Sequence, residues 1–480
     1  MNQITLPAAD LKQALSGLSK VVSRKSSLPV LQTVRLARDA AGRVSLSATD
    51  LDAFVTYRIN DPQPAEPFDV LLPYEALNKT GRGAGDVTVI AESKDKVRLR
   101  YEVAGSPLEQ SVATLAPEEF PPAPNITEFP VKMPGNFGET LRQAFETSST
   151  DSSRHVLQGA YLDVQEPNCH SIISTNGRCL FAANTFKFDL KTPVNILRHK
   201  FLTWAGFLDG ECELAVKTDK SSSGWVQLST SRWNCIVKQI DGQFPKWRQV
   251  VPSDTESWTK VRLSEAALAQ MLNLSARLPG DDTENRTLQL RVDKDLHLEG
   301  RNKDDKEFTS ALIGGASVSG KSVTTALNRE YLQNALRCGL DEIRIHTELE
   351  PMVFCHPGKR MVIMPVRLPA APAIKPAADP KPVTPETPPQ PVAVAQPERK
   401  PEMTKTAETT PTAPKTNAEA DSLKAALDQI ETVKGQLRES IGALNGLTSL
   451  LKQVEKDNRS TEKEVASVRQ TLRSLQGMKI

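Results

Sequence analysis

The sequence lacks most of the features that mark a catalytic, secreted or membrane protein. The net charge of its 480 residues is only +2 at pH 7, so no overall basic field points to nucleic acid. Its six cysteines form no CxxC pair, which favours reduced thiols over a disulfide framework or a zinc site. No Ser-His-Asp or HExxH arrangement, signal peptide or run of about 18 apolar residues occurs. We therefore expect a cytoplasmic, non-enzymatic protein without metal or cofactor.

Aromatic residues are missing from the last quarter of the chain. All 14 Phe, 5 Trp and 5 Tyr residues precede position 355. Residues 369–418 instead carry 13 prolines among Ala, Thr, Lys and Glu. Such a segment has too little apolar bulk to offset the entropy of ordering, so it predicts a disordered linker.

Proline in turn is absent after Pro414, and residues 419–480 are rich in helix-forming residues. Apolar residues recur there at multiples of seven, interrupted only by Asn458: Leu423, Ile430, Leu437, Leu444, Leu451, Val465 and Leu472. This spacing predicts a coiled coil that pairs with itself or with another helical protein. The alternative is a single amphipathic helix that docks on the globular part.

One pattern occurs three times in the first 368 residues. Two leucines and an acid stand at offsets of five and fourteen: Leu72, Leu77 and Asp86; Leu197, Leu202 and Glu211; Leu327, Leu332 and Asp341. The copies start 125 and 130 residues apart, which is too long for a solenoid repeat of about 20 to 50 residues. They predict three like domains in series, at residues 1–125, 126–252 and 253–368.

Hydrophobic periodicity predicts the contents of these domains. Apolar residues at helical spacing indicate amphipathic helices over residues 9–20, 137–147 and 264–277, one at the start of each third. A second, short helix follows in each copy of the repeat. Eight strands are expected at residues 44–47, 54–59, 97–103, 171–174, 225–229, 288–292, 308–313 and 361–364. The fold class is α+β, with two helices and antiparallel sheets in each domain.

Residues 315–322 match the phosphate-binding pattern G-x-x-x-x-G-K-[ST]. A functional loop of this kind needs a helix that opens at Lys321, but β-branched and polar residues follow. We interpret the segment as a hairpin loop, and a P-loop NTPase stays as an alternative.

Six short motifs, in order, resemble those of bacterial DNA polymerase III beta sliding clamps. They lie at residues 27–31, 46–51, 114–121, 175–178, 241–245 and 363–368, so the resemblance covers all three domains. It implies a ring-forming homodimer that encircles double-stranded DNA without sequence preference. Such a ring is a processivity factor that binds DNA polymerase and the clamp loader through peptide motifs.

The resemblance also implies site residues. Arg24, Lys25, Arg154 and His155 match family positions near DNA. Basic residues on the helices that would line the ring add Lys79, Arg82, Arg142, Arg198, Lys200, Arg277 and Arg329. The implied dimer interface includes Val112 and Leu278. The implied peptide pocket comprises Leu157, Thr175, Gly177, Leu180, Pro245, Val250, Tyr331, Val353, Val362, Met364, Pro365, Val366, Arg367 and Leu368.

Two features depart from the family pattern. Arg178-Cys179 replaces the usual His-Arg, and Gln249 stands where Arg is frequent. The chain also continues beyond Leu368, where the family sequence ends. A coiled-coil scaffold with a clamp-like body that is not loaded on DNA is therefore an alternative.

Overall fold

The computed structural model describes residues 3–367 apart from 61, 82, 84, 209, 218–223, 254–257, 281 and 283. The chain divides into two compact units, Met1–Pro376 and Ala377–Ile480, and every described residue lies in the first. The predicted linker and coiled coil, Arg82 and Leu368 therefore lie outside the described residues. Within the described part, no helix is long and apolar enough to cross a membrane.

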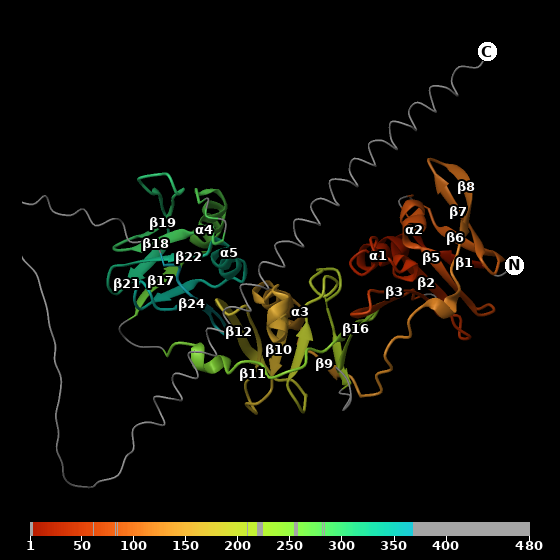
Figure 1. The fold of residues 1–480 in the computed structure, drawn as a ribbon, viewed down its shortest axis with the longest axis horizontal. Coiled ribbons are helices and arrows are strands. Elements are labelled where there is room, and N and C mark those ends of the chain that lie inside the picture. The colour runs from red at the N-terminus through yellow and green to blue at the C-terminus, as the bar shows by residue number, and fades with distance from the viewer. Residues whose placement is uncertain are drawn as a thin grey trace, which may run out of the picture. The chain divides into compact units, whose positions relative to one another are not determined.

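Four antiparallel sheets and five α-helices make up the described residues (Figure 1). The helices are α1 (Ala8–Leu18), α2 (Tyr74–Thr80), α3 (Phe137–Thr147), α4 (Glu265–Arg277) and α5 (Arg329–Arg337). Short 3-10 helices lie at η1 (Pro29–Gln32), η2 (Pro117–Glu119), η3 (Ser152–Leu157) and η4 (Trp247–Val250).

Two of the sheets have four strands each. The first has the order β1 (Gln3–Leu6), β6 (Val87–Ser93), β7 (Lys96–Val103) and β8 (Ser106–Ala113). The second has the order β20 (Thr309–Leu312), β19 (Leu296–Gly300), β18 (Leu288–Val292) and β22 (Val323–Leu327). Strands β8 and β20 are edge strands of these sheets.

The two larger sheets each cross a predicted domain boundary. The eight-stranded sheet has the order β5 (Phe68–Pro73), β2 (Thr33–Arg38), β3 (Val44–Thr49), β4 (Ala53–Arg58), β16 (Trp233–Lys238), β15 (Trp225–Ser229), β14 (Glu213–Lys217) and β9 (Val131–Lys132). The nine-stranded sheet has the order β13 (Val194–Leu197), β10 (Gly159–Asp163), β11 (His170–Thr175), β12 (Cys179–Phe186), β25 (Lys359–Ile363), β24 (Met352–His356), β23 (Glu342–Ile345), β17 (Thr259–Leu263) and β21 (Ala316–Ser319). The pairs β4–β16 and β12–β25 join the thirds of the chain through backbone hydrogen bonds.

The structure confirms the α+β class, and the eight listed strands and the three amphipathic helices each lie within two residues of an observed element. It also explains the repeat. Leu72 lies in β5 and Leu327 ends β22, while Leu77 and Leu332 are buried on the helix that follows each strand, α2 or α5. The acid of each copy precedes a strand, as Asp86 precedes β6.

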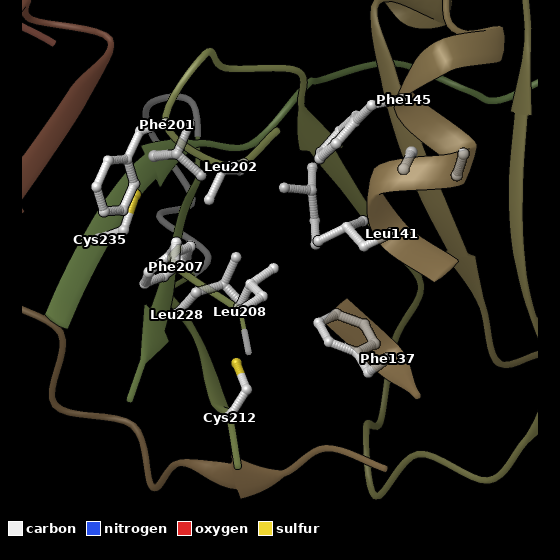
Figure 2. Close-up of a cluster of buried hydrophobic side chains, with 14 of the residues drawn as sticks. Phe137, Leu141, Phe145, Phe201, Leu202, Phe207, Leu208, Cys212, Leu228 and Cys235 are labelled. Atoms are coloured by element: carbon white, nitrogen blue, oxygen red, sulfur yellow. The ribbon is translucent and has the colours of Figure 1, made fainter. Parts of the chain in front are cut away.

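The second copy of the repeat differs from the prediction of two helices per domain. Among the described residues between β13 and β14 the chain forms consecutive turns, with no α-helix. Phe201, Leu202, Phe207 and Leu208 from this segment fill the core opposite Phe137, Leu141 and Phe145 of α3 (Figure 2). Gly206 and the aromatic residues are weak helix formers, so burying these side chains decides the local conformation.

The phosphate-loop pattern lies on strands. Residues 316–319 form β21, and β22 begins at Val323, so no helix opens at Lys321. The P-loop alternative is therefore wrong. Our hairpin interpretation is also wrong in detail, because β21 pairs with β17 and β22 pairs with β18 of a different sheet.

Candidate functional site

A second hydrophobic cluster lies on the nine-stranded sheet, separate from the main core. Strand register brings three predicted pocket residues into one row, because Val362 of β25 lies opposite Leu180 of β12 and Val353 of β24. All three are buried, and Leu157 packs against them. Sequence reasoning missed the other buried members: Ile173, Ala182, Phe244 and Trp258.

Two large apolar residues of the predicted pocket stay exposed. Met364 is 47% exposed and Val250 is 57% exposed. Met364 follows directly after β25, and its N–H donates to the carbonyl of Arg178 at 2.9 Å. The N–H of Val366 donates to the carbonyl of Ala326 at 2.8 Å, which fixes the segment that also holds Pro365 and Arg367. An exposed methionine on a fixed backbone is suited to binding an apolar side chain of a partner.

A tight turn fixes the middle of the predicted pocket. Gly177 has a φ of +85°, which favours glycine, and its N–H donates to Thr175 Oγ1 at 3.0 Å. Asn176 Nδ2 donates to the Tyr331 hydroxyl at 3.0 Å. Burial raises the pKa of the Tyr331 phenol. The structure thus ties Tyr331, on α5, to the turn that precedes β12.

The connector between the second and third predicted domains carries Pro245 and Val250, both exposed. Its aromatic residues point the other way: Phe244 is buried and stacks on Tyr161, with ring centroids 4.6 Å apart. A cluster of Phe244, Trp247 and Trp258 within fifteen residues was the sequence signal for this packing. We did not use it.

Several predicted DNA-contact residues are exposed: Arg24 and Lys25 after α1, Lys79 on α2, Arg277 on α4, and Lys200 in the turns after β13. Arg24 lies beside a cleft of about 580 Å³ between α1 and α2, which Lys12, Ser16, Ser19 and Asn78 also line. The Arg24 guanidinium contacts Glu75 at 3.1 Å and lies 5.2 Å from the centre of the Tyr74 ring. Arg142 and Arg198 are half-buried, and His155 is exposed.

Arg329 was wrongly assigned to DNA. Its side chain is 3% exposed, with Nε donating to the carbonyl of Arg286 at 3.0 Å and Nη2 to that of Pro279 at 2.8 Å. Burial lowers the pKa of this guanidinium. Arg329 therefore holds the loops around α5 together. Arg154 is exposed, but its Nη1 donates to the carbonyl of Asn176 at 2.8 Å, so it also supports the pocket turn.

The two predicted interface residues are buried within the single chain. Val112 and Leu278 are each 8% exposed and belong to the main hydrophobic core. An aspartate at either position would therefore test folding rather than association. The exposed apolar residues nearest to these elements are Leu108 on β8 and Leu312 on β20.

Comparison with known proteins shows which proteins this chain is similar to. Residues 2–124 match the family model described as DNA polymerase III beta subunit, N-terminal domain. The chain is 24% identical over 342 residues to the beta sliding clamp of Pseudomonas putida, covering 69% of this chain and 89% of that one. The beta sliding clamp of Synechococcus elongatus is 24% identical over 383 residues, covering 75% and 97%. The chain is thus similar to beta sliding clamps along nearly their whole length.

Solved sliding clamps share the fold of this chain. The DNA polymerase sliding clamp of Bacillus subtilis superposes with a TM-score of 0.65 at 18% identity, covering 76% of this chain and 99% of that one. The Pseudomonas aeruginosa clamp, solved bound to griselimycin, gives a TM-score of 0.63 at 19% identity with the same coverage. The part of this chain without a counterpart is thus about the size of the segment after Leu368.

Proposed function

We propose that this protein is a DNA sliding clamp, a non-catalytic processivity factor that encircles duplex DNA and tethers a replicative DNA polymerase. The observation that carries the proposal is the likeness to beta sliding clamps along nearly their whole length. Three like domains in series also suit a protein that works by shape. Its place of action would be the cytoplasm, and its six free cysteines agree with a reducing compartment.

Ring closure would use two of the exposed sheet edges. Strands β8 and β20 are edge strands in the first and last predicted domains, and each carries an exposed leucine, Leu108 or Leu312. An edge strand presents unpaired N–H and C=O groups that can pair with a strand of another chain. A head-to-tail dimer with two-fold symmetry would cover both edges of both chains.

Enclosure of DNA gives the main test. With a clamp loader and ATP supplied, the purified protein should stay on closed circular DNA and leave the same DNA once it is linearised. Sedimentation of the free protein should give a dimer. Equal loss from circular and linear DNA would contradict the proposal and favour the scaffold alternative.

Replacing Arg24, Lys25 and Lys79 together with uncharged residues should shorten the residence time of the protein on DNA. The same change should make DNA binding less dependent on salt. Each lost phosphate contact lowers the slope of log K against log [salt] by about 0.9, so three should lower it by about 3. A matched control replaces Lys94, Lys294 and Lys306, which are exposed in loops between strands. Residence times are read by fluorescence on tethered circular DNA. An equal effect of both sets would mean that only net charge matters.

The apolar pocket would bind partner peptides. Its proposed floor is Leu180, Val353 and Val362, and its rim is Val250 and Met364. Polymerase and clamp loader would present extended peptides with large apolar anchors, which suit such a groove.

The tail beyond the clamp fold is proposed to pair through a coiled coil. Residues 419–480, expressed alone, are expected to be helical and to self-associate with rising concentration, because a seam of apolar residues is only marginally stable without a partner. Circular dichroism and sedimentation check this. A disordered monomer at high concentration would point to a different protein as the helical partner.

A further inference from the structure

The connector between the second and third predicted domains is attached to one strand at two points. Tyr161 and Asp163 of β10 are two residues apart, so both side chains lie on the same face of the sheet. Tyr161 stacks on Phe244, with an interplanar angle of 3°. Asp163 contacts Trp247 and Arg248 in η4. Pro245 lies between these two attachment points, and Val250 follows two residues after the second.

Asp163 is a buried carboxylate with its hydrogen bonds satisfied. It is 1% exposed, and its Oδ2 accepts from Trp247 Nε1 at 2.8 Å and from Arg248 Nη1 at 2.6 Å. Its Oδ1 accepts from the N–H of Gln165 at 3.0 Å. Arg248 also lies 4.5 Å from the centre of the Trp247 ring and contacts the half-exposed Glu166 at 2.7 Å. A buried charge with these partners fixes one geometry, because any shift leaves a polar group unpaired.

The same turn presents Val250 to solvent. Trp247 and Arg248 use their side chains to hold the connector down, while Val250, the last residue of η4, is 57% exposed. A 3-10 turn held by two neighbouring side chains leaves its last residue little freedom of position. An exposed apolar residue that is held in place costs a partner little ordering entropy on binding.

We propose that Asp163, Trp247 and Arg248 are positioning residues for the partner-peptide pocket. None of them is among the pocket residues that the family resemblance implies. They act through Pro245 and Val250, two of the implied pocket residues, whose segment they hold in place. The inference rests on the proposed function, since it concerns how the same pocket is kept ready for its peptide.

The test compares the buried carboxylate of Asp163 with the partly buried carboxylate of Asp10, 15% exposed, in the full-length protein. Asp163→Asn keeps the shape of the side chain but places an amide N–H₂ against an N–H donor. Asp10→Asn is the matched control. Asp10 accepts from the Tyr57 hydroxyl at 2.6 Å and from Arg232, at the junction between the first and second predicted domains. Affinity and dissociation rate are measured with a synthetic Gln-Leu-Ser-Leu-Phe peptide by surface plasmon resonance. Melting temperature and sedimentation are recorded for each variant.

We expect Asp163→Asn to lower the affinity for the peptide about tenfold, mostly through faster dissociation. The reason is that the rim of the pocket then has to be ordered when the peptide binds. Asp10→Asn should lower the melting temperature by a similar amount and leave peptide affinity unchanged. Glu166→Gln, which removes only the outer ion pair of Arg248, should also bind normally. Equal affinities for Asp163→Asn and wild type, or equal losses in Asp163→Asn and Asp10→Asn, would overturn the inference. Failure of the wild-type protein to bind the peptide would instead overturn the proposed pocket.

Discussion

Replacing Met364 with aspartate is expected to abolish peptide binding while the protein stays folded and dimeric. Met364 is 47% exposed in the free protein, so the new carboxylate remains hydrated there. A bound peptide would remove the water around this carboxylate and leave it next to the apolar side chains of Val362 and Leu180. An unpaired carboxylate in an apolar groove costs several kcal/mol, so we expect affinity to fall by at least about 100-fold.

The control is the same chemical change at a comparable exposed position. Leu349 is 53% exposed in the loop between β23 and β24, and Leu349→Asp should leave peptide binding intact. Met364→Leu, which conserves volume, should cost little. Calorimetry with the synthetic peptide and sedimentation of each variant make the comparison. Undiminished affinity in Met364→Asp would show that the peptide binds elsewhere.

Replacing Gly17 with valine is expected to destabilise the junction between the first two predicted domains. Gly17 lies in α1, and a Cβ there would be 2.3 Å from Cη2 of Trp233 and 2.8 Å from Cζ3 of Trp204. The indole of Trp233 has little room to move, since Trp233 is only 2% exposed. Its ring centre lies 4.7 Å from that of Tyr57 and 5.0 Å from that of Phe201. Forcing extra volume into such a core costs about 1 to 3 kcal/mol, and the short distances place this case at the upper end.

Calorimetry should therefore show the melting temperature of Gly17→Val lowered by roughly 5 to 10 °C. Gly135→Val is the matched control, because nothing lies within 4 Å of its would-be Cβ. The helix itself is not the cause of the loss, since glycine is already the weaker helix former. A melting temperature equal to that of the wild type would mean that the two tryptophans can rearrange.

The sequence was sufficient for the eight strands listed from it and for the three longest helices. Alternating residues such as those of β18 and amphipathic residues such as those of α3 respond to local rules of burial, so their pattern specifies them. The segment at residues 198–208 follows a different rule. Its repeat signature resembles that of α2 and α5, but Phe201 and Phe207 gain more from filling the core than the backbone gains from a helix.

The candidate site was only partly predictable for a related reason. Leu180, Val353 and Val362 are ordinary buried strand residues in sequence, and only the register of three strands makes them neighbours. Arg329 shows the reverse case, since a charged residue at the start of a helix suggested solvent exposure. Its two carbonyl partners come from residues 279 and 286, which no local pattern connects to it.

The continuous sheets have a mechanical consequence. At each junction the neighbouring strands share a run of registered pairs, from Trp233 opposite Tyr57 to Val237 opposite Ala53, and from Cys179 opposite Ile363 to Ala183 opposite Lys359. A force along these strands loads the hydrogen bonds of each junction together in shear. Several bonds therefore have to break at once before the strands separate. Each chain should thus resist deformation at these two junctions. A motor that opens the ring would do its work at the contacts between chains, and the elastic compliance of the assembly would be concentrated there.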